Sequence, residues 1–159
     1  MSARLDAAKI APAAYHAMLG LEHYVQQSGL ESSLIHLVKL RASYMNGCSY
    51  CIDMHSKDAL AEGETVQRIV SVPLWLETPF YTDRERAALA WTEAVTAIDP
   101  ESVSDELYAE LKRFFSEEEI VKLTMAIVTI NGWNRLAISF RTEPGSYQRR
   151  EPAPGKTAA

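Results

Sequence analysis

A long apolar segment near the C-terminus constrains the fold of this chain more than any other feature. Residues 120–140, IVKLTMAIVTINGWNRLAISF, are apolar on almost every side in their first half. Ser116 and Glu119 precede the segment with the spacing of a capping box, in which each side chain accepts a hydrogen bond from the other residue's backbone amide. Because a helix that is apolar all round is normally buried, we predict a helix here, at the centre of the core or of an interface.

The rest of the chain also shows helical spacing between clear breaks. Asn46-Gly47 is a break of the kind that ends helices, and Thr82 and Glu85 repeat the capping-box spacing. No stretch alternates polar and apolar residues as a strand would. Further helices are predicted over about 12–29, 32–46, 48–61, 64–72, 82–98 and 102–115, with a packed connection at 73–81. We therefore predict an all-α, single-domain bundle of about six to seven helices over residues 1–143, followed by a flexible C-terminal tail, 144–159.

Charge and composition argue against two classes of partner. A net charge of -5 and a pI near 5.4 do not fit a nucleic-acid binder, which normally presents a basic face. No apolar run approaches the roughly 20 residues that a membrane helix needs. The first 16 residues carry charges and no continuous apolar stretch, so they make a poor secretory signal. We expect a cytoplasmic protein with no membrane or nucleic-acid partner.

The most specific local pattern is NGCSYCIDMH, residues 46–55, which holds both cysteines of the chain and a histidine. Cys48 and Cys51 are one helical turn apart, close enough for a disulfide after modest adjustment, and His55 lies one turn further on the same face. This spacing indicates a dithiol that cycles with a disulfide. The start of a helix would activate Cys48 as a thiolate, whereas a neighbouring imidazole would activate Cys51, so the attacking sulfur stays open at this point.

Two other interpretations of the pair compete with redox chemistry. A zinc site could combine both thiolates and His55 with one of His16, His23 and His36, although three ligands within eight residues of one helix would be unusual geometry. Alternatively, the cysteines are simply small buried apolar side chains. Their pairing in a chain that uses cysteine nowhere else favours the redox interpretation.

A wider pattern resembles the alkylhydroperoxidase D-like (AhpD-like) branch of the carboxymuconolactone decarboxylase family. The resemblance begins with LVKLRASYMNGCSYCIDMHSKDA and continues in ETPFYTDRERAALAWTEAVT and EEEIVKLTMAIVTINGWNRLAI, so that it covers roughly residues 30–140. It implies an all-helical domain that assembles as a homo-oligomer, a trimer or hexamer.

The same resemblance implies a peroxidase that uses no bound cofactor or metal. Cys51 matches the cysteine that a hydroperoxide oxidises to sulfenic acid, and Cys48 matches the partner that protonates the leaving group and closes the disulfide. His55 matches the histidine of a proton relay that activates the attacking thiol. The disulfide would be reduced by an external dithiol, carried by a lipoyl-bearing or thioredoxin-like protein.

One position departs from the family pattern. The relay usually starts from a glutamate twelve positions before the first cysteine, and here that position is His36. A neutral imidazole accepts a proton, but it cannot hold His55 protonated by charge as a carboxylate would. Either His36 substitutes in the relay or activity is weakened; otherwise His36 is a packed histidine with no role.

Two further functions remain as alternatives. The other branch of the family implies a carboxymuconolactone decarboxylase-type lactone decarboxylase, whose chemistry needs no thiols. A non-catalytic redox sensor would use the disulfide to change an interface without turnover. Three smaller expectations concern neighbouring residues: Tyr50 lines the pocket or only packs, Asp53 and Lys57 form a helical ion pair, and residues 133–135 serve packing or subunit contact.

Overall fold

The computed structural model describes residues 2–99 and 101–149, which contain helices and no strand. The elements are α1 (Ala7–Ile10), α2 (Pro12–Gln26), α3 (Ser32–Asn46), α4 (Ser49–Ala61), α5 (Val66–Ser71), the 3-10 helix η1 (Val72–Glu77), α6 (Asp83–Ala97), α7 (Asp105–Leu111) and α8 (Glu117–Phe140). The predicted all-α fold class is confirmed, and the predicted breaks separate the helices.

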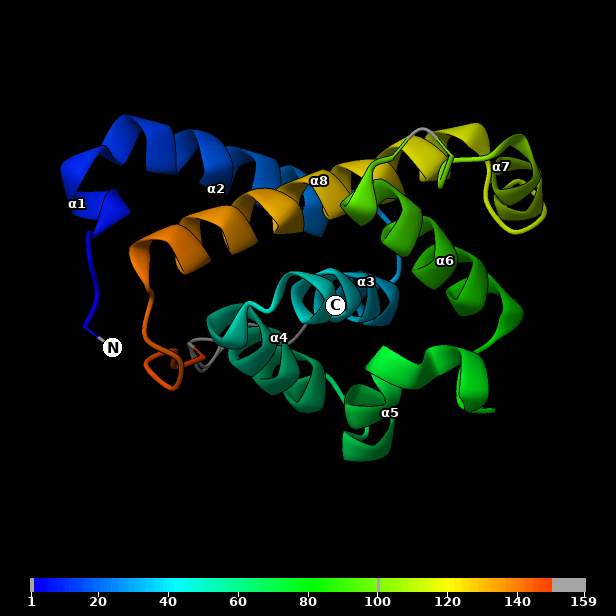
Figure 1. Ribbon diagram of the computed structural model, residues 1–159, viewed down its shortest axis with the longest axis horizontal. Helices are drawn as coiled ribbons and strands as arrows, with labels where there is room; N and C mark the ends of the chain where they lie inside the picture. The colour runs from blue at the N-terminus through cyan, green and yellow to red at the C-terminus, as the bar shows by residue number, and fades with distance from the viewer. Residues whose placement is uncertain (1, 100, 150–159) are drawn as a thin grey trace, which may run out of the picture.

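Helix α3 lies at the centre of the bundle. It packs against α4, α6 and α8, while α2 lies along α8 (Figure 1). Leu37, Val38 and Leu40 of α3 are fully buried, as expected for a helix with neighbours on several sides. Because α4 packs directly on α3, residues of these two helices can form one site.

The long apolar segment forms α8, and both predicted capping boxes are present. Ser116 and Glu119 cap α8, and Thr82 and Glu85 cap α6 in the same way. Burial is limited to part of the α8 surface, since Leu123, Ile127 and Ile130 are almost completely buried. Val121, Val128 and Ile138 on the same helix are about half exposed. The helix therefore contributes one face to the core rather than being enclosed all round.

Three local features differ from the sequence prediction. Helix α7 ends at Leu111 rather than near Phe115, because the chain turns there to bring Phe115 into the core. The connection after Pro73 forms η1 and buries Trp75. Helix α1 has no buried residue, so apolar periodicity gave no sign of it, and it is held at its start by the Asp6 side chain, which accepts from an amide of the first turn.

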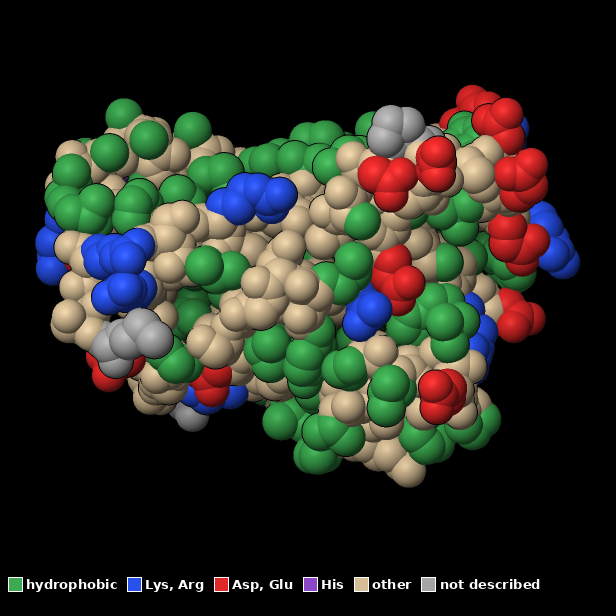
Figure 2. Space-filling view, viewed as in Figure 1, with side chains coloured by type: hydrophobic (Ala, Val, Ile, Leu, Met, Phe, Trp, Pro, Cys, Tyr) green, Lys and Arg blue, Asp and Glu red, His purple; other side chains and the backbone are tan. Residues whose placement is uncertain are grey.

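Exposed apolar side chains form a patch over α5 and η1. Figure 2 shows them at the lower edge of the view, over α5 and η1, where Val66, Val70, Leu74 and Leu76 are each more than 60% exposed. Assembly into an oligomer stays a prediction. In the described part of the chain, no helix is both long and apolar enough to cross a membrane.

After α8 the chain folds back onto α4. The Gly145 amide donates to Asp53 Oδ2 at 3.1 Å, and the Tyr147 hydroxyl donates to Asp58 Oδ1 at 2.8 Å. The predicted Asp53–Lys57 ion pair is confirmed at 2.8 Å, and Lys57 also donates to the Tyr147 carbonyl. Residues 144–149 of the predicted tail thus run along α4; residues 150–159 lie outside the described residues.

Candidate active site

The cysteine turn forms where α3 ends and α4 begins. Gly47 adopts a left-handed conformation (φ 70°) that ends α3, and the Cys48 amide then donates to the Ser43 carbonyl at 3.0 Å. Cys48 is the N-cap of α4, and its Sγ accepts a weak hydrogen bond from the Cys51 amide at 3.4 Å. The helix dipole therefore favours negative charge on this sulfur.

The two cysteines form a disulfide, with their Cα atoms 5.4 Å apart. Both side chains are almost completely buried, and they pack against Ala42 of α3 and Ile130 of α8. The sequence spacing thus brings the two sulfurs together as expected, on a helix that is supported from two sides.

The two predicted histidines face the same interior region from different helices. His55 lies on α4, one turn after Cys51, and His36 lies on α3; their ring centroids are 6.2 Å apart. His55 is 4% exposed, and neither of its ring nitrogens has a hydrogen-bond partner in residues 2–99 and 101–149. Nδ1 of His36 is also buried with no partner in this part of the chain. These nitrogens are therefore available for proton transfer.

A buried lysine helps to keep His55 neutral. Burial has the largest effect, and together with the positive charge of Lys39 and the proximity of His36 it holds the pKa of His55 well below the ordinary 6.5. Lys39 is 3% exposed on α3 and pairs with Glu22 of α2, which also accepts from Trp133 Nε1 at 3.1 Å. A neutral imidazole is the form that can accept a thiol proton.

Glu62 also belongs to this region, and sequence reasoning missed it. Its Oε2 lies 3.1 Å from His36 Nε2 and also accepts from the Ser32 hydroxyl, while its Oε1 accepts from Arg149 at 3.2 Å. Burial would raise the pKa of Glu62, but the hydrogen bonds and positive charge around it hold that pKa below its ordinary value. The available sequence signal was its position seven residues after His55, two turns along the same face.

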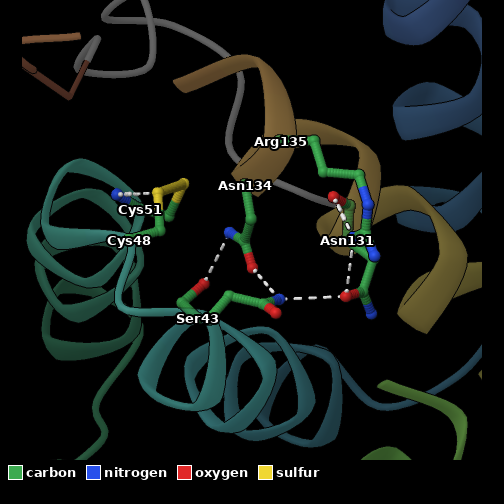
Figure 3. Close-up of a disulfide and its surroundings, with 7 residues drawn as sticks. Ser43, Cys48, Cys51, Asn131, Asn134 and Arg135 are labelled. Carbon is green, nitrogen blue, oxygen red and sulfur yellow. Dashed lines mark hydrogen bonds between the residues drawn. A yellow bond between two sulfur atoms is a disulfide. The ribbon is translucent and has the colours of Figure 1, made fainter. Parts of the chain in front are cut away.

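A buried amide network fixes the cysteine turn to the rest of the bundle. Asn134 Nδ2 donates to Ser43 Oγ at 3.1 Å, and Asn46 Nδ2 donates to the side-chain oxygens of Asn134 and Asn131 at 2.8 and 2.9 Å. Asn131 in turn donates to Thr96 of α6. Figure 3 shows Asn134 pointing from α8 toward Ser43 beside the disulfide. Three helices are therefore tied together beneath the turn.

We expect Asn134→Ala to lower the free energy of unfolding by about 2–4 kcal/mol, because it leaves Ser43 and Asn46 without their buried partner and opens a small cavity. Urea unfolding followed by circular dichroism measures the change. Ser139→Ala is the matched control, since Ser139 is an exposed residue of the same helix outside the network. Equal stability of the two variants would contradict the structural role of the network.

An open pocket of about 320 Å³ borders the disulfide. Cys48, Ser49 and Tyr50 line it from the start of α4, and Arg141 and Pro144 line it from the end of α8 and the segment after it. Tyr50 thus lies at the pocket, one of the two positions that the sequence allowed. Of the two cysteines, Cys48 is the one that lines this pocket.

The zinc alternative finds no support in residues 2–99 and 101–149. His16 and His23 lie on exposed positions of α2. No group of three or more histidine, cysteine, aspartate or glutamate side chains in this part of the chain is placed to hold a metal ion.

Comparisons with known proteins show the family and the fold. The profile of the carboxymuconolactone decarboxylase family matches residues 12–94. YdfG, an uncharacterized protein of Bacillus subtilis strain 168, is 41% identical over 146 residues, which are 92% of this chain and 99% of YdfG.

Solved structures show the same fold. ATU0492 of Agrobacterium tumefaciens, a protein of unknown function suggested to be an antioxidant defence protein AhpD, is 46% identical, with a TM-score of 0.88 over 92% of this chain and all of that one. An uncharacterized peroxidase-related protein from Ralstonia eutropha JMP134 with an alkylhydroperoxidase AhpD core gives a TM-score of 0.76 at 18% identity, covering 86% of this chain and 73% of that one. The second likeness concerns the fold alone.

Proposed function

Because the chain belongs to the carboxymuconolactone decarboxylase family and has an AhpD-like fold, we propose that it is a thiol-dependent peroxidase that reduces hydroperoxides. One observation supports this proposal most. A closed Cys48–Cys51 disulfide at the start of α4 lies one turn from His55, a buried histidine whose depressed pKa keeps it neutral. A dithiol beside a proton acceptor is what reduction of a peroxide requires.

The first half-reaction oxidises Cys51. His55 takes the Cys51 thiol proton, and the thiolate attacks one peroxide oxygen, so that the S–O bond forms as the O–O bond breaks. Cys48 gives its proton to the departing alkoxide, which leaves as an alcohol, or as water when the oxidant is hydrogen peroxide. Cys51 is then a sulfenic acid and Cys48 a thiolate, stabilised by the start of α4.

The second step closes the disulfide. The Cys48 thiolate attacks the Cys51 sulfur, and the hydroxide that leaves takes the proton held by His55 to form water. In sum, two thiols and one hydroperoxide give a disulfide, an alcohol and water. His36, behind His55, shares the proton in the interval.

An external dithiol returns the pair to the reduced state. Because the open pocket borders Cys48, we propose that the thiolate of a lipoyl-bearing or thioredoxin-like protein attacks this sulfur first and leaves Cys51 as the departing thiolate. The cytoplasm is the proposed compartment, since such reductants keep thiols reduced there. We also propose a homo-oligomer, a trimer or hexamer, with the exposed apolar residues of α5 and η1 as available contact surface.

The proposal is tested by titrating free thiols before and after one equivalent of hydrogen peroxide, then after dithiothreitol and after repeated peroxide. We expect both thiols to disappear together, return with reductant and disappear again over many cycles. Thiols that stay unreactive in the folded protein would contradict the peroxidase. A single oxidation without catalytic loss of peroxide would favour the redox sensor instead. A lactone decarboxylase would leave the thiols without a role.

A further inference from the structure

The peroxidase relay described above lacks a carboxylate at the position where the family pattern has one. His36 occupies that position on α3, and a neutral imidazole carries no charge to stabilise a proton on its neighbour. A carboxylate nevertheless reaches the same place from the other helix. Glu62 is the C-cap residue of α4, and its Oε2 lies 3.1 Å from His36 Nε2.

We propose that Glu62 is the positioning residue of the proton relay, and that it supplies through His36 the negative charge that the family pattern places at position 36. This proposal rests on the proposed peroxidase function. When His36 Nε2–H donates a hydrogen bond to Glu62, the ring is the tautomer whose other nitrogen, Nδ1, is an acceptor. This Nδ1 is buried without a partner among the described residues, and the ring of His55, whose two nitrogens are likewise unpartnered there, is centred 6.2 Å away.

The proton then moves between three side chains, Cys51, His55 and His36. His55 takes the Cys51 proton, and His36 Nδ1 takes it from His55, directly or through one bridging water, which rings 6.2 Å apart allow. His36 becomes an imidazolium that Glu62 stabilises as an adjacent charge. When the sulfenic hydroxide leaves, the proton returns along the same path. No proton is gained or lost over the cycle.

The surroundings of Glu62 suit this role. Its two oxygens divide their partners, because Oε2 accepts from Ser32 and His36 while Oε1 accepts from Arg149. These contacts fix the carboxylate in its charged form. Lys39, the buried cation near His55, is paired with Glu22 of α2, whereas Glu62 contacts His36.

Glu62 is also placed to exchange protons with solvent. With Ser32 and His36 it lines an open pocket of about 380 Å³, separate from the pocket that borders Cys48. The relay is therefore buried at His55, whereas Glu62 at its other end is accessible to solvent. Glu62 can therefore keep its hydration and its charge while the proton moves between the two histidines.

The test compares single and double variants by kcat/KM for hydrogen peroxide. We expect Glu62→Gln to lower kcat/KM by roughly 100-fold, the lower end of what a positioned proton acceptor contributes, while thiol oxidation by excess peroxide still goes to completion. The matched control is Asp53→Asn, because Asp53 lies on the same helix and bonds to Lys57 and to the Gly145 amide rather than to the relay. It should keep wild-type activity.

The deciding variant places the carboxylate directly on α3. His36→Glu should be active, and adding Glu62→Gln to it should change kcat/KM by less than about twofold, since the two positions then no longer depend on each other. Wild-type activity in Glu62→Gln, or an equal loss from Glu62→Gln in both backgrounds, would overturn the proposal. Absence of peroxide turnover in the wild-type protein would instead overturn the peroxidase function itself.

Discussion

We expect Cys51→Ser to lower peroxide turnover by more than about 1000-fold, because a serine hydroxyl at this position has neither the acidity nor the nucleophilicity of a thiol. Cys48→Ser should also stop turnover, but for another reason. Cys51 would still be oxidised once and would remain a sulfenic acid, since no second thiol can close the disulfide. Serine keeps the N-cap of α4 in that variant.

Coupled peroxide assays and trapping with dimedone distinguish the two variants. Dimedone should label Cys48→Ser after peroxide and should not label Cys51→Ser. Ser56→Ala is the matched control on α4 and should behave as wild type. Labelling of Cys51→Ser instead would show that Cys48 is the attacking cysteine. Full activity of both serine variants would contradict the dithiol mechanism.

His55→Gln should lower kcat/KM for peroxide by about 100- to 10,000-fold at pH 7, because it removes the group that accepts the thiol proton. The pH profile makes the prediction specific. The depressed pKa of His55 means that the imidazole stays neutral, and active as a base, as the pH falls through 6.5. Wild-type kcat/KM should therefore be nearly flat between pH 8 and pH 6, and should fall only below that range.

Without the histidine, attack depends on the fraction of thiolate that water alone can form. In His55→Gln the rate should then rise about tenfold for each pH unit up to the thiol pKa, ordinarily about 8.5. His16→Gln, an exposed substitution on α2, should keep the wild-type profile. Parallel profiles for wild type and His55→Gln would show that His55 is not the base.

Local signals explain how much of the fold the sequence predicts. A capping box such as Thr82 with Glu85, or a left-handed break such as Gly47, depends on a few neighbouring residues and can be recognised without knowing the tertiary structure. The turn after Leu111 could not be predicted in this way. It follows from the burial of Phe115 against other helices, which no local pattern shows.

The same distinction holds within the candidate site. Cys48, Cys51 and His55 share one helix, so their spacing alone places them on one face. Glu62 reaches His36 only because the end of α4 packs beside the start of α3. Lys39 looks like an ordinary charged residue in the sequence, and its burial depends on a partner from α2. Glu62 and Lys39 therefore join the site through contacts between helices, which residue spacing along the sequence does not show.

The disulfide encloses very little of the chain, and this limits what it does for folding. A cross-link between Cys48 and Cys51 spans a single helical turn. In the chain-entropy view, closing so short a loop removes about 2 kcal/mol of unfolded-state freedom, against about 5 kcal/mol for a loop of some 100 residues. A domain of this size is commonly stable by about 5–15 kcal/mol. The bundle can thus pass between its oxidised and reduced forms without approaching the unfolding transition.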